Sequence, residues 1–138
     1  MATMIVNLNK ESDNLSAENT LKVISVMRGG IPGSARYGLR QVNEVMASFG
    51  IDTTSYYVVD GSGVSHYNLV TAEILVRLLQ AMSQQTDLFP LFYRSLAIAG
   101  LDGTLKTRMK NTPGEGNLRA KTGSIGGVSS LSGYVTTR

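Results

Sequence analysis

Apolar side chains recur at three- and four-residue spacing through most of the chain before residue 111, and this period predicts amphipathic helices. Met4, Ile5 and Leu8 fit one face of a short opening helix, although a strand fits them nearly as well. Thr71 is expected to cap the clearest helix. The helices that the pattern predicts after the opening segment run over about 14–28, 35–48, 71–82, 87–97 and 104–110.

The pattern changes to strands near the end of the chain. Two runs, 117–122 and 129–137, are expected to form a hairpin through the glycine turn at 126–127. A β-rich run at 56–59 leads into a second glycine-containing turn. Because an isolated hairpin is marginally stable, we expect an α+β fold, one partial domain over 1–138, whose incomplete sheet offers a surface for self-association.

Composition restricts the possible functions. The chain has 138 residues, 42% of them hydrophobic and 17% charged, which is ordinary for a folded domain. The net charge is +3, but the basic residues are scattered, which argues against nucleic-acid binding. Zero cysteines and one histidine leave few ligands for a zinc site, so we expect no metal or other cofactor. The sequence shows neither a membrane span nor a signal peptide.

Two tripeptides carry the candidate chemistry, Ser12-Asp13-Asn14 and Lys121-Thr122-Gly123. Alone, the first is an ordinary helix cap and the second is common by chance. Together they resemble the second and third motifs of the active-site-serine penicillin-recognising enzymes. Ser12 is then the candidate proton relay to a leaving amine, and Asn14 the group that holds a substrate amide in register.

The second tripeptide predicts a carboxylate-binding strand. Lys121 supplies positive charge, and Thr122 supplies a hydroxyl donor for a peptide that ends in a free carboxylate. Gly123 leaves room for a substrate backbone beside the strand. The backbone N–H of Ser124 is expected to form half of an oxyanion hole. Asn117 is expected to be a surface residue. In the full-length enzyme, its replacement by Ala should reduce transition-state stabilisation by less than about 1 kcal/mol.

Longer segments make the resemblance specific. They resemble, in order, five segments of the D-alanyl-D-alanine carboxypeptidases among the class C low-molecular-mass penicillin-binding proteins. These segments are Lys10–Glu18, Val59–Thr71, Ala99–Arg108, Arg119–Ile125 and Leu131–Val135. The resemblance implies a β-lactamase/transpeptidase-like fold, in which a helical lobe and part of an antiparallel sheet flank the cleft. It also implies a serine-type carboxypeptidase or endopeptidase that acts on peptidoglycan stem peptides ending in D-Ala-D-Ala, outside the cytoplasm, and is acylated by β-lactams.

The first motif of such enzymes, Ser-x-x-Lys, is absent, because no serine has a lysine three positions later. We therefore expect these residues to be the later, truncated part of a catalytic domain, inactive alone. The alternative is a non-catalytic homologue that binds peptide weakly or pairs with another chain. His66 with Asp60 would fit a Ser-His-Asp triad, but Asp60 and Asp102 fit tight turns better.

Overall fold

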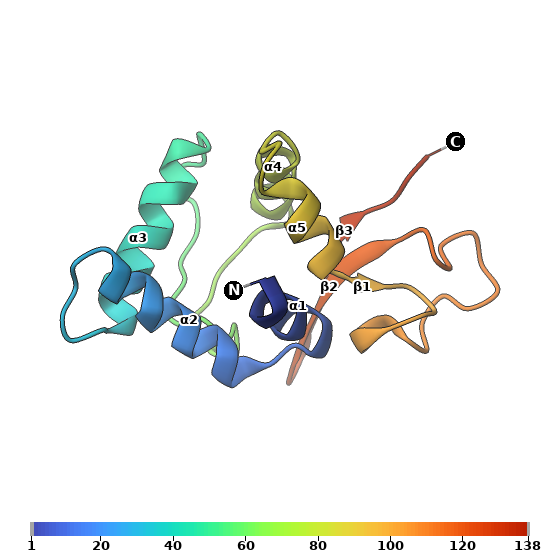
Figure 1. Ribbon diagram of the computed structural model, residues 1–138, viewed down its shortest axis with the longest axis horizontal. Helices are drawn as coiled ribbons and strands as arrows, with labels where there is room; N and C mark the ends of the chain where they lie inside the picture. Colours follow the sequence, from blue (N-terminus) through green and yellow to red (C-terminus); the bar gives the residue numbers. More distant parts are fainter. Residues whose placement is uncertain (1, 138) are drawn as a thin grey trace. The chain divides into compact units, whose positions relative to one another are not determined.

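The computed structural model describes residues 2–137 and has an α+β architecture (Figure 1). Its helices are α1 (Ala2–Glu11), α2 (Asn14–Met27), α3 (Ala35–Ser48), α4 (Ala72–Ser83) and α5 (Phe89–Ser95). Its strands are β1 (Ala97–Ile98), β2 (Arg119–Ile125) and β3 (Val128–Tyr134), and a 3₁₀ turn, η1, covers Gly103–Leu105. Two compact units result: the helical unit, residues 14–81, and the sheet unit, which contains the residues up to 13 and those from 82 onward.

Close helix packing defines the helical unit. Ser34 caps α3, because its hydroxyl accepts a hydrogen bond from the N–H of Tyr37, and Thr71 caps α4 through the N–H of Ile74. A Cβ at Gly38 would lie 2.2 Å from the carbonyl oxygen of Leu21, so the backbones of α2 and α3 approach each other at this glycine. The apolar core of the unit consists of Met46, Ile51, Tyr56 and Ile74.

The sheet unit is built on three antiparallel strands in the order β1-β2-β3. Ala120 of β2 pairs with Ala97 on one side and with Gly133 on the other. Ala97, Leu105 and Ala120 are fully buried and form the core of the unit. Helix α1 lies beside α5 (Figure 1), where the side-chain amide of Asn9 donates to Ser95 Oγ at 2.7 Å. The start of the chain is thereby attached to the elements that lead into the sheet.

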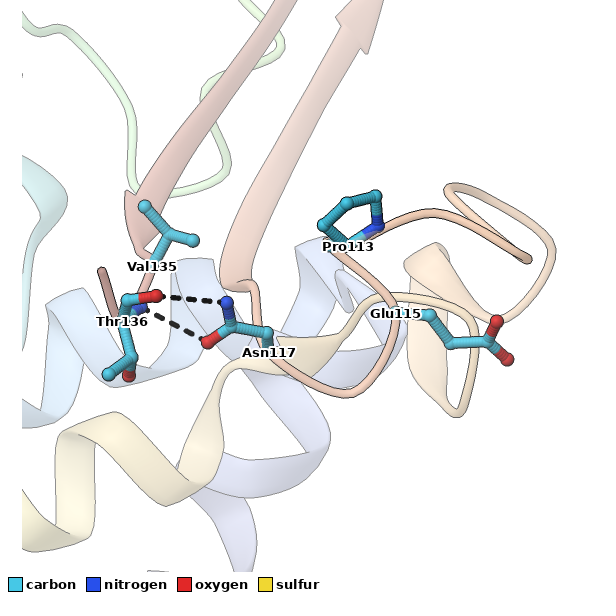
Figure 2. Close-up of a pocket in the computed structure, with 6 residues that line it drawn as sticks. Pro113, Glu115, Asn117, Val135 and Thr136 are labelled. Carbon is cyan, nitrogen blue, oxygen red and sulfur yellow. Dashed lines mark hydrogen bonds between the residues drawn. The ribbon is translucent and has the colours of Figure 1, made fainter. Parts of the chain in front are cut away.

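The side chain of Asn117 extends the sheet beyond the paired backbones. Its amide nitrogen donates to the carbonyl oxygen of Thr136 at 3.0 Å, and its amide oxygen accepts from the N–H of Thr136 at 3.1 Å (Figure 2). The amide thus pairs with the backbone as a strand residue would. Both hydrogen bonds are exposed to solvent, so water can replace them, and the small cost expected for Asn117→Ala stays a prediction.

Three predicted elements differ from the structure. The helix expected over 87–97 ends at Ser95, because Ala97 and Ile98 pair with β2 instead. The helix expected over 104–110 is only the short turn η1. The β-rich run at 56–59 forms a single bridge, between Tyr57 and Leu69, and no strand. In the first and third cases, pairing with another segment decides the conformation, and a local pattern does not show such pairing.

Within residues 2–137, every helix falls short of the length and apolar character that a membrane crossing requires.

We predict that Gly133→Ala destabilises the sheet unit. A Cβ at this position would lie 2.1 Å from the carbonyl oxygen of Arg119 and 2.6 Å from the Cβ of Ala120, and neither backbone can move without breaking the β2–β3 pairing. The free energy of unfolding, measured by denaturant titration, should fall by about 2 kcal/mol or more.

The matched control for this substitution is Gly126→Ala. Gly126 has no neighbouring atom within 4 Å of an added Cβ, and its backbone is not left-handed. Its free energy of unfolding should change by less than about 0.5 kcal/mol. Equal losses in the two variants would contradict the close packing at Gly133.

Candidate active site

Ser12 lies directly after α1 in a strained backbone conformation. Its φ is 56°, in the left-handed region that residues with a side chain seldom adopt. The next residue, Asp13, closes the turn by donating its N–H to the carbonyl oxygen of Leu8 at 3.2 Å. Strained residues persist only where their surroundings hold them, and they are concentrated at functional sites. The strained conformation makes Ser12 a candidate functional residue.

The contact is with Lys121, the lysine of the second tripeptide. Lys121 Nζ donates to Ser12 Oγ at 2.7 Å and to the carbonyl oxygen of Thr122, also at 2.7 Å. The side chain is half-buried, and this burial lowers the pKa of Lys121 below its usual value of 10.5, because the charged form loses hydration. Two residues that the sequence predicted to share one site therefore touch each other in the sheet unit.

Thr122 leaves β2 on the face opposite to Lys121, because side chains alternate along a strand. Its hydroxyl donates to the hydroxyl of Thr104, in η1, at 2.8 Å. Thr104 is not among the site residues predicted from the sequence. A hydroxyl within a short turn has no distinctive periodicity, so only its position in the segment Ala99–Arg108 could have drawn attention to it.

Gly123 and Ser124 complete the predicted strand site. A Cβ at Gly123 would lie 2.4 Å from Ser130 Oγ, so the glycine makes room for its cross-strand neighbour. The room it is expected to give a substrate backbone remains a prediction. Ser124 is exposed and follows Thr122 on the same face of β2.

Asn14, the last residue of the first tripeptide, is placed in the helical unit. It is exposed and is the first residue of α2. The structure therefore brings Ser12, Lys121 and Thr122 into one connected group within the sheet unit, and Asn14 is described apart from that group. Its role toward a substrate amide stays a prediction.

Asp60 holds a turn in the helical unit. Its carboxylate accepts hydrogen bonds from the backbone of Gly63 and Ser65 and from the side-chain amide of Asn68. His66 is exposed, and no bond to Asp60 is recorded for it among the described residues. The carboxylate is thus engaged in shaping the turn, which favours the structural interpretation of Asp60 over the triad.

Glu18 fixes the same turn from α2. Its carboxylate accepts from the N–H groups of Gly61 and Ser62 at 3.0 and 2.9 Å. Asp102 has a comparable role in the sheet unit, where it accepts from the N–H of Ile98 at 2.7 Å. Across residues 2–137, no three His, Cys, Asp or Glu side chains gather closely enough to hold a metal ion.

Comparison with known proteins gives consistent matches. Residues 1–138 match the D-Ala-D-Ala carboxypeptidase 3 (S13) family. The D-alanyl-D-alanine carboxypeptidase of Actinomadura sp. (strain R39) is 39% identical over 140 residues, which cover 98% of this chain and 26% of that protein. D-alanyl-D-alanine carboxypeptidase DacB of Haemophilus influenzae is 30% identical over 96% of this chain and 28% of its own length.

A solved structure supports the same assignment. The crystal structure of penicillin binding protein 4 (dacB) from Haemophilus influenzae, complexed with a β-lactam, is similar with a TM-score of 0.90 and 29% identity. The match covers 97% of this chain and 31% of that chain, so the present sequence spans less than a third of the relatives named here. Sequence and fold agree over nearly all of its residues: the chain belongs to the D-Ala-D-Ala carboxypeptidase 3 (S13) family of serine-type peptidases.

Proposed function

We propose that this chain supplies the Ser12–Lys121 relay and the carboxylate-binding strand of a carboxypeptidase or endopeptidase that cleaves peptidoglycan stem peptides ending in D-Ala-D-Ala. The observation that carries the proposal is the 2.7 Å hydrogen bond from Lys121 Nζ to Ser12 Oγ. Such a peptidase would act outside the cytoplasm, where its substrate lies.

The direction of that hydrogen bond fits a proton relay. Because Lys121 donates, the hydrogen of the Ser12 hydroxyl remains available for a second acceptor. As the peptide C–N bond breaks, the leaving amine takes that hydrogen, and the positive charge of Lys121 stabilises the negative charge that develops on Ser12 Oγ. Ser12 Oγ then takes up the proton that the lysine of the proposed Ser-x-x-Lys segment removed from the nucleophile, so that Ser12 is again a hydroxyl. Burial of Lys121 strengthens this effect, because less water screens the pair.

The edge of β2 that β1 leaves unpaired, from Lys121 onward, is proposed to bind the substrate. When the substrate binds, Thr122 would donate its hydroxyl hydrogen to the terminal carboxylate and would accept a hydrogen bond from Thr104 in place of the one that it donates to it here. The N–H of Ser124 would form half of the oxyanion hole. Gly123 would let the peptide backbone approach the strand between them. Asn14 would hold the substrate amide.

The nucleophile is proposed to come from a Ser-x-x-Lys segment that these 138 residues do not contain. In such a segment, the lysine accepts the serine proton and the serine oxygen attacks the carbonyl carbon of the scissile peptide bond. A penicillin would acylate the same serine.

We predict that Lys121→Ala impairs an enzyme in which this chain is joined to a Ser-x-x-Lys segment. The change removes the charge that acts on Ser12 Oγ, and the loss in kcat/KM on a D-Ala-D-Ala peptide should correspond to about 3 kcal/mol or more.

Lys110→Ala is the matched control. Lys110 is exposed, and within residues 2–137 its side chain has no recorded hydrogen bond or ion pair. Its kcat/KM should stay within about twofold of the parent, as for most surface changes. Equal losses from the two alanine variants would reduce Lys121 to a structural residue.

We predict that the 138-residue chain alone forms no covalent adduct with labelled penicillin, because no serine in it has a lysine partner at the required spacing. Intact-mass and peptide mass spectrometry after incubation should show the unmodified chain. An adduct mapped to any residue would refute the proposed origin of the nucleophile.

The same assay separates the proposal from its non-catalytic alternative. In the enzyme that includes a Ser-x-x-Lys segment, labelling at that serine supports the peptidase. If neither form is labelled and neither hydrolyses the peptide, the non-catalytic alternative, a protein that binds peptide weakly or pairs with another chain, is favoured.

A further inference from the structure

Three consecutive residues, Asp102, Gly103 and Thr104, contact residues close in the chain to Ser12 and to Lys121. Asp102 precedes η1, and Gly103 and Thr104 are its first two residues, in a segment to which the proposed mechanism gives no role. Asp102 and Gly103 contact the end of α1, from which Ser12 projects. Thr104 contacts Thr122, which follows Lys121 in β2.

Asp102 anchors the end of α1. Its Oδ2 forms an ion pair with Lys10, two residues before Ser12, and its Oδ1 accepts from the N–H of Ile98 at 2.7 Å. Burial alone would raise the pKa of Asp102, but these two hydrogen bonds and the charge of Lys10 outweigh it and hold the pKa below its usual value. The carboxylate thus stays charged and ties α1 to the strand β1.

Gly103 allows the backbones to meet. Its φ is 53°, and an added Cβ would lie 2.5 Å from the carbonyl oxygen of Lys10 and 3.1 Å from the Cβ of Ala97. Only glycine adopts this backbone conformation freely and leaves that space open. The carbonyl of Lys10 therefore packs directly against the turn, and the position of α1 relative to the turn is closely fixed.

Thr104 acts on the opposite partner. Its hydroxyl accepts the hydrogen bond from Thr122 at 2.8 Å, and both side chains are only partly exposed. Since Thr122 is covalently adjacent to Lys121, this contact restrains the position of the part of β2 that carries Lys121. The turn thus contacts Lys10, two residues before Ser12, and Thr122, the residue after Lys121.

We propose that Asp102, Gly103 and Thr104 form a clamp that positions Ser12 against Lys121. All three are positioning residues, because they act through Lys10 and Thr122 rather than on a substrate. The clamp also supplies the support that the left-handed backbone of Ser12 requires. Its importance for catalysis rests on the proposed function, but its effect on the geometry of the pair does not.

The test is a titration of the Lys121 side-chain amine, followed by NMR in the 138-residue chain. Loosening the clamp separates Lys121 from Ser12 and admits water to the amine, so its pKa should rise toward 10.5. Asp102→Asn, which can still accept from the N–H of Ile98, and Thr104→Val, which removes only the hydroxyl, should both produce this rise.

Two matched variants control the experiment. Thr104→Ser keeps the hydroxyl and should titrate like the unmodified chain. Glu73→Gln removes the exposed ion pair of Glu73 with Arg77, the other ion pair found in the described part of the chain, and should leave Lys121 unchanged. Backbone amide spectra identify any variant that unfolds, and if Asp102→Asn does so, the comparison of Thr104→Val with Thr104→Ser decides.

A pKa of Lys121 that is unchanged in the folded Asp102→Asn and Thr104→Val variants would overturn the clamp. A rise of equal size in Thr104→Ser would overturn it as well. Because the titration needs no substrate, its outcome is independent of activity. A shifted pKa in a protein that fails to hydrolyse D-Ala-D-Ala peptides would retain the clamp and refute the proposed function.

Discussion

The hydrogen bond between Lys121 and Ser12 is the interaction on which the site depends, and it joins residues 109 positions apart. Neither partner can reach the other by local structure alone. Ser12 needs α1 to be docked beside α5, and Lys121 needs β2 to be paired on both sides. The site is therefore a product of the whole sheet unit, and any change that shifts α1 against the strands acts on it.

The sheet unit keeps these parts together with very small side chains at its centre. Ala97 and Ala120 are fully buried opposite one another, and Gly133 faces Ala120 from β3. Small residues let the strands approach closely beside Leu105. At Gly133 an added side chain would meet backbone atoms of β2, which cannot move aside as a flexible side chain could.

The parts of the fold that could be predicted are those with local signals. Helix α3 has its expected bounds, because its apolar period is supported by a serine cap at Ser34 and a glycine at Gly50. Strand β1 has only two residues and exists through pairing with β2, so no pattern marks it. The pairing of Asn117 with Thr136 was not predicted for a similar reason, since the two residues lie 19 positions apart.

In the candidate site, too, some residues could be predicted from the sequence and others could not. The two tripeptides were recognisable through their resemblance to family motifs, since alone the first is an ordinary helix cap and the second is common by chance. The residues that support them were not, since contacts such as that of Thr104 with Thr122 depend on folding. Several other residues in the family-like segments prove to hold backbone amides in turns, as Glu18 and Asp60 do. Residues of the family-like segments thus maintain the conformation of turns in addition to supplying candidate reactive groups.

The left-handed backbone at position 12 also narrows the choice between the two aliphatic hydroxyl residues. Threonine carries a branched β-carbon, which is severely disfavoured at a φ of 56°, whereas serine tolerates that conformation with a smaller penalty. A proton relay by itself would accept either alcohol. In this fold, the direction in which the chain leaves α1 excludes one of them, so the identity of the residue is set by backbone geometry as well as by acid–base chemistry.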